Sequence, residues 1–250
     1  YGRDGHLTEV SSEIQKETTL SMRVNGRPIA RLSCSTSHLE ELVIGNLYTE
    51  GYISSIGDIA SVEISDRNER ADVLLRSRTE NLALATSETA QLRDVRPVTN
   101  CNFAGCKGMR PVEPIIWTPD SIFAMMDVFA SDHERHCRTR GTHSAYLWKG
   151  GKLRCRSEDI GRRNAFDKAI GAALIEEVEL SECALFISGR ISTDMVAKAI
   201  ESRIPILVSK AAATDGSIEL ARALHLTLVC NARNDSMEVV SDSTEIGFAT

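Results

Sequence analysis

The 250-residue sequence lacks the marks of several large protein classes. Its 29 basic residues stand against 35 acidic ones, and the net charge of −6 gives no general attraction to nucleic acid or anionic membranes. No apolar run approaches the roughly 20 residues that cross a bilayer, and the first twenty residues show no signal-peptide pattern. We therefore expect a cytoplasmic protein with neither a nucleic acid nor a membrane as partner.

Two glycine-rich phosphate-binding motifs are also absent. Neither G-x-G-x-x-G nor G-x-x-x-x-G-K-[ST] occurs, which disfavours a standard dinucleotide or P-loop site.

The seven cysteines form an odd, scattered set, unlike the dense even framework of a small secreted domain, so most should be reduced. Cys183 and Cys230 lie in apolar strand-like runs, where we expect inert core residues. Hydrophobic residues are plentiful at 42%, enough for a substantial core.

Residues 1–98 are predicted to form a small α+β unit with a leading arm. Asn25-Gly26, between two alternating segments, is typical of a tight hairpin turn. Ser37 is expected to cap the following helix, in a capping box with Glu40. The elements predicted in this unit are a hairpin over 20–35, a helix over 37–53 and two strands within 59–77.

Residues 115–250 are predicted to form a larger α/β domain. It begins with a helix capped by Thr118 or Asp120 and continues as a hairpin over 144–159. Buried apolar strands then alternate with helices, which indicates a largely parallel or mixed sheet covered on both faces. The strands are expected over 183–189, 204–210 and 226–231, and the helices over 164–177, 192–202 and 217–225.

Polar loops follow the strands of this predicted sheet. Because ligands bind beyond the carboxyl ends of strands in such sheets, four polar loops together favour a phosphorylated or nucleotide-like ligand. Taken singly, each loop also fits a solvated turn with a helix cap. The residues concerned are Glu158, Asp159, Arg162, Arg163, Asn164, Asp167 and Lys168; Gly189 and Arg190; Ser209, Lys210 and Thr214; and Asn231, Arg233, Asn234 and Asp235.

Residues 99–114 are predicted to be a linker loop that carries Cys101 and Cys106. Lys107 and Arg110 supply positive potential that favours a thiolate at neutral pH. A glycine-flanked, activated thiolate suits a sulfur that must visit two partners, so we favour the catalytic interpretation. The residues that interrupt regular structure here are Gly105, Gly108, Pro111 and Pro114.

Three other interpretations of these cysteines stay open. A structural zinc site needs four ligands, and the sequence offers few further candidates, so we expect no metal. A lasting disulfide is disfavoured by a cytoplasmic location. Inert loop cysteines are the third interpretation. The additional local zinc candidates are His133, His136 and Cys137.

Several segments resemble the FdhD/NarQ family of formate dehydrogenase accessory sulfurtransferases, over about residues 20 to 240. They are RVNGRPIARLSCS, LEELVIGNLYTEGYI, the cysteine loop, GTHSAYLW, SEDIGRRNAFDKAIG, SGRISTDMVAKA and IPILVSKAAAT. The resemblance implies that a cysteine desulfurase loads a loop cysteine as a persulfide. The sulfur then passes to the bis(molybdopterin guanine dinucleotide) molybdenum cofactor of formate dehydrogenase. It also implies a homodimer and a cytidine-deaminase-like three-layer α/β/α domain without zinc.

The resemblance assigns roles to particular residues. Many members carry two cysteines in an S-G-C-G-x-C-G setting; matching A-G-C to S-G-C makes Cys106 the persulfide carrier, with Cys101 upstream as helper or alternative. At two positions where the family usually has an aromatic and a second basic residue, this sequence has Asn231 and Ser236 instead. The family's first basic residue is kept as Arg233. The residues expected to contact the cofactor are Asn231, Ala232, Arg233, Asn234, Asp235 and Ser236, with Gly189, Arg190, Ser209 and Lys210.

Two rival functions fit part of this pattern. A cofactor-binding chaperone for formate dehydrogenase assembly would use the polar loops without any covalent sulfur transfer. A redox enzyme would instead cycle Cys101 and Cys106 as a disulfide. His143, beside a predicted strand, is a candidate for proton transfer or for a purely structural role.

Overall fold

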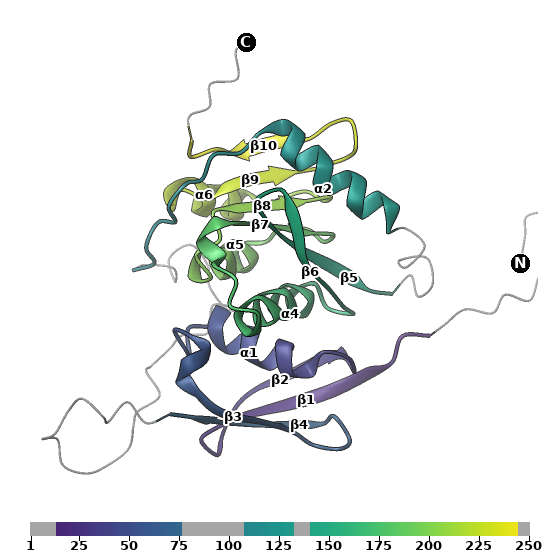
Figure 1. Cartoon of the computed structure of the whole chain (residues 1–250), viewed down its shortest axis with the longest axis vertical. Coiled ribbons are helices and arrows are strands. Elements are labelled where there is room, and N and C mark those ends of the chain that lie inside the picture. The colour runs from purple at the N-terminus through teal and green to yellow at the C-terminus, as the bar shows by residue number, and fades with distance from the viewer. Residues whose placement is uncertain (1–13, 77–107, 133–140, 245–250) are drawn as a thin grey trace, which may run out of the picture.

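A computed structural model describes residues 14–76, 108–132 and 141–244 and shows two sheets joined through a pair of crossing helices (Figure 1). The predicted boundary at residues 98 and 99 falls outside the described residues. None of the helices in these described ranges is long and apolar enough to span a membrane.

The small unit is a four-stranded sheet in the order β2-β1-β4-β3, covered by one helix. The two outer pairs are antiparallel, and β1 and β4 run parallel in the middle. The elements are β1 (Glu17–Val24), β2 (Arg27–Ser35), α1 (Leu39–Thr49), η1 (Ile56–Asp58), β3 (Ile59–Ile64) and β4 (Arg70–Leu75).

The predicted hairpin is confirmed, but the predicted helix cap is wrong. Asn25 and Gly26 both take positive φ angles, 49° and 78°, as a tight turn between antiparallel strands requires. The residue before α1 is His38 rather than Ser37, and no side chain caps the helix. Only three residues connect β2 to α1, and His38 makes the sharp change of direction in the left-handed conformation, with φ 55°. The expected capping box with Glu40 is therefore not formed.

The larger domain is built on a six-stranded mixed sheet in the order β10-β9-β8-β7-β5-β6. Strands β7, β8 and β9 are parallel, and the other pairs are antiparallel. Its elements are α2 (Pro119–Ser131), β5 (His143–Lys149), β6 (Lys152–Asp159), α4 (Arg162–Ile175), η4 (Leu180–Glu182), β7 (Cys183–Ile187), α5 (Thr193–Glu201), β8 (Ile206–Ser209), α6 (Asp215–Ala223), β9 (Thr227–Cys230) and β10 (Glu238–Ser241).

Helices cover both faces of this sheet, as predicted (Figure 1). Thr118 caps α2, and its hydroxyl accepts a hydrogen bond from the Ser121 amide. Every residue of β7 is buried, because alternate side chains enter the cores above and below: Leu185 packs toward α4 and α5, and Phe186 toward α2. Cys183 is buried there, which confirms its place in the core. Cys230 is likewise buried in β9.

Strand β10 was not predicted, and the sequence gives little sign of it. Only Val239 and Val240 are apolar in this four-residue strand, which pairs antiparallel with β9 at the edge of the sheet. Polar residues on both sides mask so short a signal.

The two units meet where α1 crosses α4. A methyl group on Gly45 would lie 1.8 Å from the carbonyl oxygen of Asp167, and one on Gly171 would lie 1.9 Å from that of Glu41. The helix backbones therefore touch at the crossing, and no other residue type fits at these two positions. Because α4 covers its second face, α1 buries Asn46 and Thr49 as well as the predicted apolar residues Leu39, Leu42, Val43 and Leu47.

Candidate functional site

The loops that follow β7, β8 and β9 are bonded into one surface at the carboxyl edge of the sheet; we call residues 188–190, 209–214 and 231–236 the sheet-edge loops. The Ser209 hydroxyl donates to the Gly189 carbonyl at 2.7 Å. The Ala232 amide donates to the Ser209 carbonyl at 3.0 Å. The predicted gathering of these three loops at one edge is therefore observed.

The residues predicted to contact the cofactor divide into supporting and exposed ones. Ser209 and Ala232 are buried, and the Ser209 hydroxyl is used within the loops, so these two hold the surface in shape. Asn231 is half-buried and donates to Glu238 at 2.8 Å. The exposed members are Arg190, Lys210, Arg233, Asn234, Asp235 and Ser236.

Arg233 and Lys210 are oriented by neighbouring groups. The Arg233 guanidinium donates to the main-chain carbonyls of Lys210 and Ala232. The Lys210 amino group lies 5.2 Å from the centre of the Phe129 ring at the end of α2, a cation–π contact. Asn234 is tied to the same helix, where it donates to Asp127 at 2.8 Å. Two cations are thus held in place at the surface of the loops.

Arg162, at the start of α4, adds a further cation beside Gly189. A methyl group on Gly189 would lie 3.1 Å from the Arg162 side chain and 3.2 Å from Nδ1 of His143, so glycine permits this close packing. Burial, together with the nearby positive charge of Arg163, lowers the pKa of Arg162. Its Nε is buried and has no hydrogen-bond partner among the described residues. The Thr142 hydroxyl is unpartnered in the same way.

The unpartnered donors of Arg162 and Thr142 are suited to bind an anion. An unpaired buried donor costs free energy that an acceptor such as a phosphate oxygen would recover. Burial, with the charge of Arg162, lowers the pKa of His143, so His143 is neutral at pH 7 and can donate or accept a hydrogen bond. Thr142 was not singled out from the sequence. The sequence feature that could have identified Thr142 is its position just before β5. The neighbouring strand, β7, ends at the polar loop that contains Gly189.

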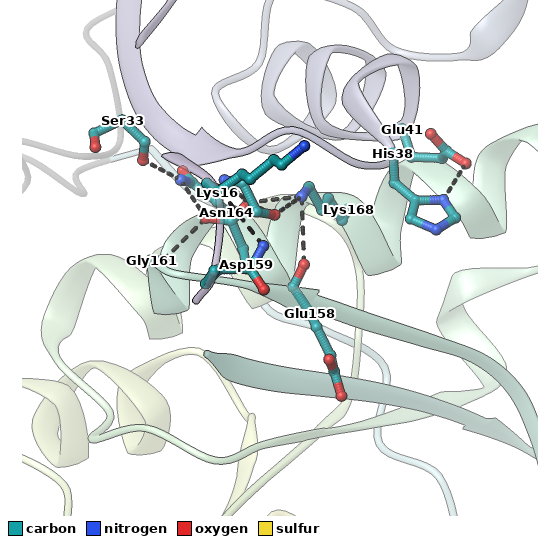
Figure 2. A network of polar contacts seen from close by, with 11 residues as sticks. Lys16, Ser33, His38, Glu41, Glu158, Asp159, Gly161, Asn164 and Lys168 are labelled. Carbon is teal, nitrogen blue, oxygen red and sulfur yellow. Dashed lines mark hydrogen bonds and ion pairs between the residues drawn. The ribbon is translucent and has the colours of Figure 1, made fainter. Parts of the chain in front are cut away.

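Most polar residues of the remaining predicted loop, residues 158–168, have a different role. Figure 2 shows that Asn164 and Lys168 both bond to Asp159 and that Asn164 also bonds to Ser33 of the small unit. Asp159 lies 2.6 Å from the Lys168 amino group and accepts hydrogen bonds from the amide and hydroxyl of Ser35, at 3.0 and 2.9 Å. Asn164 donates to the Ser33 carbonyl at 2.7 Å. These three side chains join the units and do not face a ligand at the sheet edge.

A second buried network joins the units near the helix crossing. The Lys198 amino group lies 2.8 Å from Glu50 and 3.0 Å from Asp167. Asn46 and Thr49 of α1 donate to the Asp167 carboxylate at 2.9 and 2.8 Å. Burial opposes the charge of Lys198, but the two carboxylates outweigh it and raise the pKa of Lys198. This cluster also serves the interface between the units.

Cys101 and Cys106 lie outside the described residues, whereas the chain just after them is described. The Val112 amide donates to the Leu224 carbonyl at 3.0 Å, and Arg203 donates to the carbonyls of Arg110 and Pro111 at 3.3 and 2.9 Å. Leu224 and Arg203 precede β9 and β8. The predicted linker therefore enters the large domain at the amino edge of the parallel strands, opposite the sheet-edge loops.

The four described cysteines are free thiols poorly suited to sulfur transfer. Burial raises the pKa of Cys34, Cys183 and Cys230 to about 11 and that of Cys155 to about 12. The reactive form of cysteine is the thiolate, which is scarce at neutral pH for such groups. None of the four described cysteines is therefore a good candidate for a carrier thiolate; Cys101 and Cys106 lie outside the described residues.

Comparison with known proteins identifies the family. The "Sulfur carrier protein FdhD" of Listeria innocua is 30% identical over 248 residues, with 95% of this chain and 92% of the relative covered. The protein of the same name from Bacillus licheniformis is 29% identical over 257 residues, covering 98% and 94%. A crystal structure from Desulfotalea psychrophila, described as that of a formate dehydrogenase accessory protein, shares the fold with a TM-score of 0.73, at 23% identity and with 98% and 95% of the two chains covered. The FdhD/NarQ family profile matches residues 15–247, and the chain belongs to the FdhD/NarQ family.

Proposed function

We propose that this protein is a sulfurtransferase that carries sulfur for formate dehydrogenase assembly. The observation that carries the proposal is the nearly full-length match to proteins named sulfur carriers. The raised pKa values of the four described thiols, three of them buried and Cys155 half-buried, support it, because they leave the glycine-flanked Cys106 as the best candidate carrier. The sulfur donor is a cysteine desulfurase, and the acceptor is the bis(molybdopterin guanine dinucleotide) molybdenum cofactor.

The first chemical step is a thiol exchange. The Cys106 thiolate attacks the outer sulfur of a persulfide on the desulfurase, a sulfur–sulfur bond forms on Cys106, and the desulfurase cysteine leaves as a thiolate. Lys107 and Arg110 favour the attacking thiolate by their positive charge. The outer sulfur then moves to the molybdenum of the cargo, which supplies two electrons to make sulfide, and Cys106 returns to a thiolate.

The sheet-edge loops are the proposed site for the nucleotide part of the cargo. Arg190, Lys210 and Arg233 face solvent there and match the charge of a diphosphate. The buried Nε of Arg162 and hydroxyl of Thr142 supply donors that the described residues leave unpartnered. We place the phosphates of the guanine dinucleotide against this group of side chains.

The described residues that follow Cys106 in sequence lie at the edge of the large sheet opposite the proposed cargo site. Gly108 follows Cys106 by two residues and belongs to the segment anchored at the amino edge. The four residues of β8 alone separate the edges by about 13 Å. A residue two positions from Gly108 reaches no more than about 7 Å from it. Transfer therefore requires the segment around Gly108 itself to move, or a second copy of the chain to present its own cysteine, as the expected homodimer would allow.

Replacement of Cys106 by serine in cells that depend on this protein for formate dehydrogenase activity tests the proposal. We expect activity to be lost in Cys106→Ser and kept in Cys155→Ser, a matched control on a half-buried described thiol. A chaperone without covalent transfer would keep the activity in both variants. A redox enzyme would lose it equally in Cys101→Ser and Cys106→Ser.

A further inference from the structure

The buried carboxylate of Asp159 joins the end of β6, the start of α4 and the small unit. One of its oxygens accepts hydrogen bonds from the Gly161 amide and the Asn164 side chain, both at 2.9 Å (Figure 2). The other oxygen accepts from the amide and hydroxyl of Ser35, at 3.0 and 2.9 Å, and lies 2.6 Å from the Lys168 amino group. Asp159 has no exposed surface, so one fully buried side chain connects these three parts of the protein.

Only a carboxylate suits this position, because the groups around Asp159 all donate to it. The Lys168 amino group also donates to the Ser35 hydroxyl at 2.7 Å, so the proton of that hydroxyl is left for Asp159. An ionised carboxylate has only acceptor sites, whereas an asparagine of the same shape would turn two N–H donors toward donors on one side. Replacement of Asp159 by asparagine therefore breaks part of the junction without changing its volume.

The start of α4 depends on this carboxylate. Gly161 is the residue before the helix, and no side chain caps its first turn, so the bond from the Gly161 amide to Asp159 fixes the entry of the chain. On the other side of Arg162, the Arg163 side chain is paired with Asp194 at the start of α5. Both sequence neighbours of Arg162 are thus held by carboxylates that belong to other elements.

Arg162 is the cation that α4 supplies to the sheet-edge loops. It packs against Gly189, where a methyl group would lie 3.1 Å from its Cβ and Cδ atoms. His143, which would lie 3.2 Å from the same methyl group, is the register partner of Asp159 in the β5–β6 pair. The two side chains that flank Gly189 therefore both adjoin Asp159, one through the chain and one across the sheet.

We propose that Asp159 is a positioning residue of the sheet-edge site: it holds Arg162 toward the phosphates of the cargo and makes that position depend on Ser35 of the small unit. The inference rests on the proposed cargo site. Asp159 does not touch the ligand, and it acts through Gly161 and the first turn of α4. The small unit thereby influences nucleotide affinity. By linkage, a bound nucleotide strengthens the contact between Ser35 and Asp159 by the same factor.

Isothermal titration of the full chain with guanosine diphosphate tests the positioning role. Ser35→Ala and Asp159→Asn should each weaken binding at least about fivefold, the lower end of typical coupling between sites. Thr49→Val is the matched control, because it removes a buried hydroxyl that bonds Asp167 between the same two units, beyond the first turn of α4, and should leave the affinity unchanged. In Arg162→Ala, which keeps the other cations of the site, Ser35→Ala should change the affinity by less than about twofold.

Hydrogen exchange supplies a readout that a loss of stability alone would not produce. The Ser35 amide, which donates to Asp159, should exchange more slowly when guanosine diphosphate binds the wild type, and this slowing should be absent in Arg162→Ala. If Asp159→Asn does not fold, Ser35→Ala and the exchange of the Ser35 amide decide the question.

The possible failures can be told apart. Binding by the wild type that Ser35→Ala and Asp159→Asn leave unchanged would overturn the positioning role and keep the cargo site. Equal weakening by Thr49→Val would show a general effect of packing between the units and would also overturn the positioning role. No binding of guanosine diphosphate by the wild type would refute the proposed cargo site itself, and this inference with it.

Discussion

Gly45 and Gly171 face each other where α1 of the small unit crosses α4 of the large domain. A methyl group on Gly45 would lie 2.8 Å from the backbone nitrogen of Gly171. This close approach brings Asp167 within hydrogen-bond distance of Asn46 and Thr49. Two glycines in different helices thus permit the polar interface between the two units.

Substitution of Gly171 by alanine should destabilise the protein strongly. In an exposed helix the same change would add about 1 kcal/mol of stability, because alanine is the better helix former. Here the methyl group meets the Glu41 carbonyl, and the helices must separate, so we expect a net loss of about 3 kcal/mol or more. Urea unfolding measures the loss. Gly57→Ala is the control, since its methyl group would meet only an ordinary contact at 3.4 Å. Equal stabilities for the two variants would contradict the helix crossing.

Replacement of Lys198 by methionine should leave two buried carboxylates, Glu50 and Asp167, without their cation. Breaking a buried pair in this way costs about 3–5 kcal/mol. The matched control is Lys149→Met, which breaks an ion pair with the exposed Glu182 and should cost no more than about 1 kcal/mol. Calorimetry or urea unfolding of both variants measures the two losses of stability. A small effect at Lys198 would mean that this cluster does not hold the units together.

Removal of positive charge from the sheet-edge loops should weaken nucleotide binding. We expect the double variant Arg190→Ala with Lys210→Ala to bind guanosine diphosphate at least about tenfold more weakly, because a hydrogen bond to a charged group contributes about 1.5–3 kcal/mol. Isothermal titration at two salt concentrations measures the affinity and its ionic part. Lys152→Ala with Arg154→Ala removes the same charge from exposed positions on β6 and should leave binding unchanged. Equal weakening of nucleotide binding by the two double variants would point to nonspecific electrostatic attraction.

The buried thiol of Cys34 should make stability fall at alkaline pH. Burial, followed by the charge of Asp159, raises its pKa from 9.0 to about 11. Between these values the unfolded chain loses the thiol proton while the folded chain keeps it, so the free energy of unfolding decreases as pH rises. The slope from this one group is at most about 1.4 kcal/mol per pH unit. Unfolding measured across this window should show a shallower slope in Cys34→Ala than in the wild type. Identical slopes would exclude the buried thiol as a cause.

Local patterns predicted most of the fold. The turn at Asn25-Gly26 and the alternation of apolar strands with helices each rest on neighbours in sequence, and the structure confirms them. The same holds for the cap of α2, which was expected at Thr118 or Asp120 and is found at Thr118. Where a second element decides the outcome, prediction was weaker. The cap at Ser37 was wrong because the short connection from β2 sets the backbone at His38. The contact between Gly45 and Gly171 could not be read from the sequence, because it joins positions over 100 residues apart.

The same limit applies to the candidate site. The loops at Gly189, Ser209 and Asn231 were expected at one edge because each follows a parallel strand, and that expectation holds. Asp159 and Lys168 looked equally suited to a ligand, yet their partner is Ser35, more than 120 residues away in sequence. A polar cluster at a helix start does not reveal whether its partner is a ligand or another part of the chain.

The central claim is that Cys106 carries sulfur as a persulfide, and intact mass spectrometry tests it most directly. Wild type, Cys101→Ser and Cys106→Ser are incubated with a cysteine desulfurase and cysteine, then measured with and without reductant. We expect the wild type and Cys101→Ser to gain the mass of one sulfur atom, removable by reductant, and Cys106→Ser to gain none. No gain in the wild type, or an undiminished gain in Cys106→Ser, would contradict the claim.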